Sequence, residues 1–219
     1  MSPQSLDTEQ VRSAFQFISS RMKEKSEALR KLDAACGDGD LGITVTNGFT
    51  AVENQLQKLA GESPSRLLRT LGMTFNNAAA STFGVFFATA FMHAGKAIDG
   101  LSAIEASHVP AMMRSAAEGI MARGRADVGD RTLLDALVPA CDAADTALAD
   151  GGDLQAILSA AAAAAVRGAE GTRNLSPRVG RARWLGDKIK GVEDPGAVLV
   201  AYFLEACRDA WQDQQEETA

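Results

Sequence analysis

The sequence is poor in the residue types that mark several common classes of protein. Its 219 residues include only two histidines and three cysteines, and no apolar stretch reaches the length of about 18 residues that a transmembrane helix needs. The N-terminal segment MSPQSLDTEQ lacks the apolar run of a secretion signal. Cys36, Cys141 and Cys207 form neither an even disulfide set nor a paired metal-ligand spacing, so we expect small, buried, reduced thiols. These absences predict a soluble, cytoplasmic protein that does not enter a membrane.

The sequence also has no excess of positive charge. Its formal net charge is -6 at pH 7 and its pI is about 5.0, whereas a nucleic-acid-binding surface needs a basic face. We therefore expect no nucleic-acid partner, and any bound anion must be held by local groups. A chain of this length can bury a core without disulfides, and typical domain sizes predict a single domain over residues 1–219.

Apolar residues recur with helical spacing along almost the whole chain, and no convincing alternating strand pattern is present. Val11, Phe15, Ile18 and Met22 fall at i, i+4, i+7 and i+11, and residues 45–59 repeat the pattern. The sequence therefore predicts an all-α fold. Breaks at glycine, proline and small residues divide it into expected helices over 8–32, 41–60, 64–78, 81–97, 109–123, 131–149, 153–172 and 195–213.

Most connections between these eight helices are short, which predicts an antiparallel, up-and-down barrel or bundle. Asp130, Asp153 and Asp194 precede three of the helices and are expected to cap them, with Pro195 in the first turn of the last helix.

One connection, residues 174–194, is much longer than the others. A connection of about 20 residues in a compact domain is usually functional or disordered, and the regular chemistry of this one favours function. Trp184 inside it either folds the segment over a ligand or anchors it to the surface.

Residues 32–49, LDAACGDGDLGITVTNGF, place three aspartates within eight positions. Asp33, Asp38 and Asp40 would repel one another so close together, and no cationic residue in the stretch neutralises them. A hard cation bound between them would remove this repulsion. Because the three surround the turn between the first two expected helices, their side chains can converge at one end of the bundle.

The ligand types indicate which cation fits. An EF-hand is excluded because its twelfth position, counted from Asp38, would be Phe49 where a bidentate glutamate is required. Carboxylate oxygens without histidine or cysteine suit Mg²⁺, which usually completes its coordination with substrate phosphates. The simpler alternative is that the aspartates are helix caps in a polar turn. For three aspartates around two glycines, we favour the metal site.

Several motifs together resemble a known family, the L subunit or nucleotide-binding domain of dihydroxyacetone kinases. They are LDAACGDGDLG, LGMTFNNAAAS, GDRTLLDAL and GRARWLGDKIKGVEDPGA, in the order and spacing of that family. The resemblance covers nearly the whole chain. It implies an antiparallel barrel of eight helices with the nucleotide at one end, which agrees with the helix count.

The resemblance also implies roles for individual residues. Asp33, Asp38 and Asp40 match the family's ligands for a pair of Mg²⁺ ions that hold the phosphates of ADP or ATP, so catalysis would consist of positioning and charge stabilisation. Arg181 matches a residue suited to bidentate phosphate contact. The remaining matches near the nucleotide are Gly129, Asp130, Thr132, Asp135, Gly180, Leu185, Gly186, Asp194, Pro195 and Gly196.

Two departures from the family pattern concern the site itself. Leu41 stands where the family usually has a histidine, so a hydrogen-bonding contact is lost. The family's glycine-serine phosphate loop is replaced by the shorter NNAAASTFGVFF, which leaves Ser81, Thr82 and helix N-terminal amides to contact phosphates.

The expected function is a Mg²⁺-nucleotide subunit of a kinase for dihydroxyacetone or a related small ketose. Family kinases hold the ketose through a histidine in another domain, and neither His93 nor His108 belongs to a matched motif. A substrate-binding (K-type) partner subunit is therefore implied, and a phosphocarrier protein could recharge bound ADP. The alternatives are a catalytically impaired nucleotide-binding protein that regulates or scaffolds a partner, and a helical interaction domain that binds no nucleotide.

Overall fold

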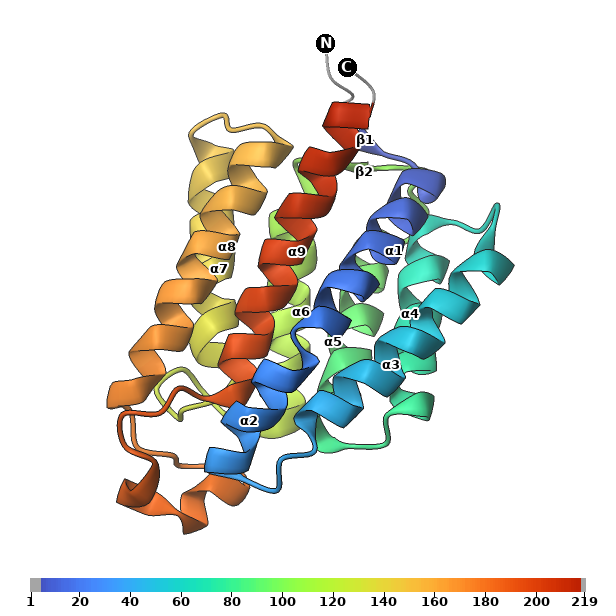
Figure 1. Cartoon of the computed structure of the whole chain (residues 1–219). Helices are drawn as coiled ribbons and strands as arrows, with labels where there is room; N and C mark the ends of the chain where they lie inside the picture. Colours follow the sequence, from blue (N-terminus) through green and yellow to red (C-terminus); the bar gives the residue numbers. More distant parts are fainter. Residues whose placement is uncertain (1–4, 218–219) are drawn as a thin grey trace.

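The computed structural model describes residues 5–217, apart from the side chains of Arg181 and Asp187, and this part of the chain contains nine α-helices (Figure 1). The all-α class is confirmed. The helices are α1 (Thr8–Glu24), α2 (Ser26–Cys36), α3 (Leu41–Leu56), α4 (Pro64–Ala78), α5 (Thr82–Ala97), α6 (His108–Gly124), α7 (Leu134–Ala149), α8 (Leu154–Gly171) and α9 (Pro195–Glu217).

Several helix boundaries differ from the expected ones by one to four residues, and two of the differences have a clear cause in the backbone. The first expected helix is two helices, because the backbone N–H of Lys25 bonds to the carbonyls of Met22 and Lys23 instead of continuing the α-helical pattern. The helix expected from residue 131 begins only at Leu134, because Arg131 has a left-handed backbone with φ of 60°.

The chain also contains short elements that the sequence did not predict. Strand β1 (Ser5–Leu6) pairs antiparallel with β2 (Ile104–Glu105), so the start of the described chain is tied to the α5–α6 connection. The 3₁₀-helix η1 (Gln57–Leu59) extends α3. Three more, η2 (Thr172–Asn174), η3 (Arg181–Trp184) and η4 (Gly186–Ile189), lie in the long connection between α8 and α9.

Two of the three expected caps are confirmed. The Asp153 carboxylate accepts a hydrogen bond from the Ala156 N–H at 2.8 Å, and Asp194 accepts one from Ala197 N–H at 2.9 Å. The expected cap at Asp130 is wrong, since α7 begins four residues later and the Asp130 side chain instead accepts from the Asp127 N–H.

The apolar stripes pack into one extended core. Val11, Phe15, Ile18 and Met22 are all buried, as their spacing predicts, and so are the apolar positions of residues 45–59. Phenyl rings of α4 and α5 stack inside the bundle, and the helices line an apolar pocket of about 250 Å³. No helix in the described residues is long and apolar enough to cross a membrane.

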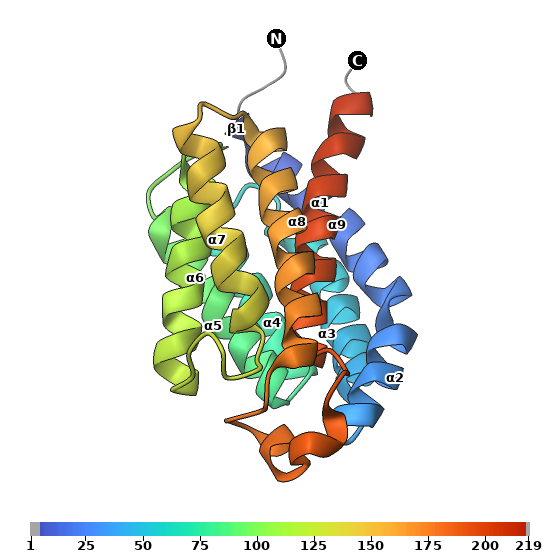
Figure 2. The same ribbon diagram turned by 90° about the vertical axis from the view of Figure 1, so that its left-hand side faces the viewer.

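The up-and-down order of the helices brings every second connection to the same end of the bundle. Residues 37–40, 79–81, 125–133 and 172–194 connect α2–α3, α4–α5, α6–α7 and α8–α9, and all four lie at the end opposite the two termini (Figures 1 and 2). We call the last of these the α8–α9 segment. Residues expected to form the functional site therefore come together from four connections.

The close packing of α8 on the start of α7 gives a first prediction. A Cβ at Gly168 would lie 2.3 Å from the backbone oxygen of Asp135, whereas a Cβ at Gly171 would meet nothing within 4 Å. Because backbone cannot move aside cheaply, Gly168→Ala should lower the free energy of unfolding by about 1–3 kcal/mol. Gly171→Ala, in the same helix, should change it by about 0.5 kcal/mol or less. Urea denaturation measures both, and equal effects would contradict this packing argument.

Candidate functional site

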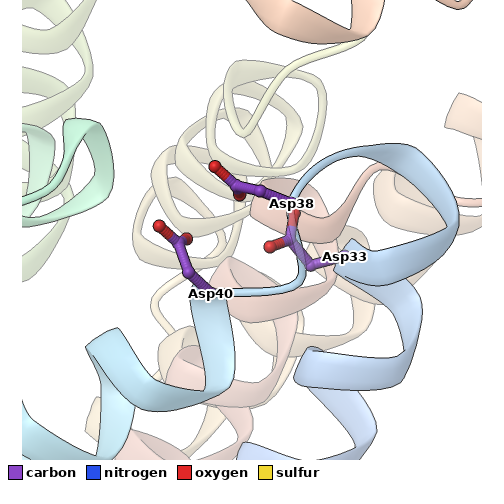
Figure 3. Close-up of side chains that lie close together, drawn as sticks. All are labelled: Asp33, Asp38 and Asp40. Carbon is purple, nitrogen blue, oxygen red and sulfur yellow. The ribbon is translucent and has the colours of Figure 1, made fainter.

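Asp33, Asp38 and Asp40 form the aspartate cluster at the turn between α2 and α3 (Figure 3). Asp33 belongs to the last turn of α2, Asp38 to the connection, and Asp40 directly precedes α3. One carboxylate oxygen from each lies within 4.8 Å of the others. The expected convergence of the three side chains is therefore confirmed, and metal binding by them stays a prediction.

The backbone around the cluster holds this turn in shape. The Asp33 Oδ2 accepts a hydrogen bond from the Leu41 N–H at 3.1 Å, which closes the turn onto the start of α3. Gly39 has a φ of 75°, a conformation that side chains with a Cβ rarely adopt. Gly42 lets α3 approach α2 closely, since a Cβ there would lie 2.4 Å from the Ser26 carbonyl oxygen.

The chemistry of the cluster fits a hard divalent cation. All three donors are carboxylates, Asp33 is partly buried, and Asp38 and Asp40 are exposed to solvent. Such a set suits Mg²⁺, which keeps several water ligands and completes its coordination sphere with phosphate oxygens. A cation would also reduce the mutual repulsion of the carboxylates.

The α6–α7 loop, residues 125–133, is held by a buried carboxylate. Asp135, only 5% exposed, accepts hydrogen bonds from the Gly129 N–H at 2.5 Å and the Thr132 N–H at 2.7 Å. The hydroxyl of Thr132 accepts from the Leu134 N–H, so Thr132 caps the start of α7. Asp135 thus fixes the loop that carries the expected nucleotide-binding residues Gly129, Asp130 and Thr132.

The α8–α9 segment, expected as a loop, has local helical structure and is tied to its surroundings by polar contacts. The Arg178 N–H donates to the Asp130 carbonyl at 3.1 Å, and the Arg178 guanidinium lies 3.8 Å from the Asp130 carboxylate. Arg173 and Glu193 form an ion pair at 3.2 Å between the two ends of the segment. The segment therefore stays close to the α6–α7 loop.

Functional roles were expected for two residues of this segment, Trp184 and Arg181, and the outcomes for the two differ. Trp184 is 80% exposed, with the Arg183 guanidinium 4.9 Å from its ring centroid, so the surface-anchor interpretation of Trp184 is wrong. Arg181 lies in η3, but its side chain falls outside the described part of the structure, and its phosphate contact stays a prediction.

The remaining expected residues lie at two helix starts of the same end. Ser81 caps α5, accepting from the Gly84 N–H at 3.1 Å, and Thr82 beside it is exposed. At the start of α9, Pro195 is buried, and Gly196 leaves room between the Asp194 carboxylate and Leu133.

Sequence reasoning missed Arg131, although it lies inside the motif GDRTLLDAL. This arginine is 2% exposed and has a left-handed backbone, a combination that is rare for its residue type. Its Nη2 donates to the Val192 carbonyl at 2.9 Å. Its position between two matched residues was the one available signal.

The electrostatics of Asp194 give a second prediction. Burial raises the pKa of its carboxyl from 3.8 to about 6, against the opposing effects of the Ala197 N–H and the Arg131 charge. The native state therefore binds more protons than the unfolded state between about pH 4 and pH 6, and the free energy of unfolding falls as pH rises through this range.

Asp194→Asn removes this effect and keeps an N-cap acceptor. At pH 8 the free energy of unfolding of this variant should be higher than that of the unmodified protein by up to about 3 kcal/mol. The difference should vanish near pH 4. Denaturant titration of both proteins over this pH range measures the difference. A variant that is destabilised at pH 8 would mean that the ionised carboxylate is favourable in the fold.

The chain is similar to proteins of one known family. A model of the DAK2 domain matches residues 35–209. The ADP-binding subunit DhaL of the PEP-dependent dihydroxyacetone kinase of Escherichia coli K12 is 30% identical over 181 residues, which cover 83% of this chain and 86% of that subunit. The D-erythrulose kinase of Mycolicibacterium smegmatis is 28% identical over 201 residues, 91% of this chain but 35% of that protein.

Among solved structures, the dihydroxyacetone kinase from C. freundii in complex with AMP-PNP and Mg²⁺ superposes with a TM-score of 0.70 at 27% identity. The match covers 91% of this chain and 33% of that one. The chain thus has nearly the extent of the DhaL subunit and about a third of the extent of the two kinases. On the family match and the E. coli relative together, the chain belongs to the DAK2 domain family.

Proposed function

We propose that this chain is the Mg²⁺-nucleotide-binding subunit of a kinase that phosphorylates dihydroxyacetone or a related small ketose. The observation that carries the proposal is the aspartate cluster, which lies at the end of the bundle where four connections meet. The relatives support the ligands, since one is named an ADP-binding subunit and another is complexed with AMP-PNP and Mg²⁺. The substrate class follows from relatives that act on dihydroxyacetone and D-erythrulose.

In this proposal, Asp33, Asp38 and Asp40 hold two Mg²⁺ ions beside the phosphates of ADP or ATP. The ions supply charge neutralisation for phosphoryl transfer, which needs positioning and electrostatic stabilisation more than covalent chemistry. Arg181 contacts a phosphate. The nucleotide is surrounded by residues from three connections and from the starts of the helices that follow two of them, namely Ser81, Thr82, Gly129, Asp130, Thr132, Asp194, Pro195 and Gly196.

A separate partner subunit supplies the ketose. The His108 Nδ1 accepts a hydrogen bond from the Glu105 N–H at the terminal end of the bundle, away from the aspartate cluster. His93 lies in α5 about 16 Å along the helix axis from its start at Thr82, and its ring packs beside Gly119. Neither histidine is placed to hold a substrate carbonyl. We therefore expect a K-type subunit to dock over the cluster, and a phosphocarrier protein is the candidate for recharging bound ADP.

One observation favours a second candidate, a catalytically impaired nucleotide-binding protein that regulates or scaffolds a partner. The connection between α4 and α5 is short and carries Ala79 and Ala80 in place of the glycine-serine phosphate loop that the family resemblance implies. The Gly84 N–H at the start of α5 already donates to the Ser81 hydroxyl, so one of the helix N-terminal amides that could contact a phosphate is occupied. This candidate keeps the nucleotide site and lacks efficient transfer.

The proposal makes a direct prediction about cooperative binding of Mg²⁺ and ADP. A ligand that binds the native state raises the melting temperature by mass action. ADP should therefore raise it strongly only with Mg²⁺ present, and Asp38→Asn should remove most of this rise because one ligand charge is lost. Asp213→Asn, at the opposite end of the bundle, is the control and should keep the full rise. If ADP stabilised the Asp38 variant equally, or worked as well in a chelator, the metal site would be excluded.

Phosphoryl transfer separates the two candidate functions. The purified chain is incubated with Mg²⁺-ATP and dihydroxyacetone, alone and with a candidate K-type subunit, and ketose phosphate is measured. The kinase proposal predicts turnover only with both subunits present. Nucleotide binding without turnover by the pair would favour the impaired protein. Turnover by the chain alone that survives substitution of both His93 and His108 would show that no partner supplies the ketose.

A further inference from the structure

We propose that Arg131 is a positioning residue that clamps the α8–α9 segment against Cys36 at the end of α2, directly before the aspartate turn, residues 37–40. The clamp can exist without a ligand, but its consequence for nucleotide affinity rests on the proposed function. The proposal combines the backbone of Arg131, its contacts and the charges around it.

The backbone aims the side chain into the protein. Arg131 has a φ of 60° at the end of the α6–α7 loop, and it is the largest fully buried side chain in the described part of the structure. A left-handed backbone is unfavourable for a residue with a Cβ and persists only where its surroundings enforce it. The hydrogen bonds of Asp135 to Gly129 and Thr132, on both sides of Arg131, supply that enforcement.

The guanidinium joins two segments that are far apart in the sequence. Its Nη2 donates to the Val192 carbonyl at 2.9 Å and lies 3.5 Å from the Ile189 carbonyl, both in the α8–α9 segment. The same nitrogen lies 3.7 Å from the Sγ of Cys36, the last residue of α2. The Cys36 thiol in turn lies 3.8 Å from the Glu193 carbonyl.

These contacts reach both parts of the proposed nucleotide site. Cys36 is one helical turn after Asp33 and two residues before Asp38. Val192 is two residues before Asp194, whose side chain caps α9. Movement of the α8–α9 segment away from the bundle would break the Arg131 contacts, so Arg131 couples the placement of that segment to the placement of the aspartates.

The guanidinium is also poorly satisfied, which argues against a purely stabilising role. Among the described residues, no hydrogen-bond partner faces its Nε or Nη1. Its charge lowers the pKa of Asp194 and of Cys36, yet for both groups burial outweighs it. Buried charges with incomplete hydrogen bonding are often replaceable by apolar residues without loss of stability. A role in positioning explains why an arginine occupies this place.

The test compares Arg131→Met, which keeps much of the side-chain volume, with Arg131→Lys, which keeps the charge and one donor group. Arg114→Met is the matched control, since Arg114 bonds Asp142 and Asp145 on the outer surface of α7. Hydrogen exchange of the ligand-free proteins reports local opening. In Arg131→Met, amides of residues 185–193 should exchange about tenfold faster relative to those of α3 and α5. Arg131→Lys should show a smaller increase, and the Arg114 variant should show none.

Binding of Mg²⁺-ADP, measured by calorimetry, gives the second readout. Arg131→Met should weaken the affinity about tenfold, with Arg131→Lys intermediate. Unchanged exchange of residues 185–193 would overturn the clamp, and so would faster exchange of all helices in equal proportion, which would indicate a general structural role. If Arg131→Met does not fold, hydrogen exchange of residues 185–193 in Arg131→Lys is compared with the unmodified protein, and an unchanged rate would likewise overturn the clamp. If the unmodified protein binds no Mg²⁺-ADP, the proposed function fails, and the exchange result still decides the clamp.

Discussion

The alternating direction of the helices is the constraint on which the candidate site depends. Because each helix reverses the direction of the preceding one, with α1 and α2 acting as one rod, the connections alternate between two ends. Four connections thus share one end, and none of them needs to be long to reach the others. The core keeps these connections in place through buried apolar stripes that contain no site residue. The site is therefore free to carry residues that are unfavourable for stability.

Several residues at this end are unfavourable in that sense. The aspartate cluster brings three carboxylates together, Asp194 has a carboxyl that burial favours in its neutral form, and Arg131 is a buried cation whose Nε and Nη1 have no hydrogen-bond partner among the residues that the structure describes. All of these lie within one end of the bundle, and ionisation of the buried Asp194 carboxyl lowers the free energy of unfolding as pH rises from about 4 to about 6. A buried carboxyl with a raised pKa beside other charged groups is typical of functional sites. Opposite charges supplied by Mg²⁺ and phosphate groups would compensate part of it.

The sequence predicted the fold well because the helical spacing of apolar residues is a local property. The break at Lys25 escaped prediction because lysine is a good helix former and its backbone remains near helical values. The convergence of the aspartates was predictable because they occupy a single turn. The roles of Asp130 and Thr132 were harder to predict, because they depend on the left-handed backbone of Arg131. An arginine gives no indication in the sequence that its backbone is left-handed. Burial of that arginine depends on the position of a segment some 60 residues later, as the contact with Val192 across 61 positions illustrates.

The two tryptophans of the chain occupy contrasting environments at opposite ends of the molecule. Trp211 is 6% exposed in the final turns of α9, whereas Trp184 is 80% exposed in the α8–α9 segment. An indole in water emits at longer wavelength and is quenched more readily by dissolved iodide than an indole in an apolar core. The intrinsic fluorescence of the protein therefore contains two separable signals, and the quenchable one reports the surroundings of the α8–α9 segment. Movement of that segment can be followed optically in the unlabelled chain, with Trp211 as an internal reference.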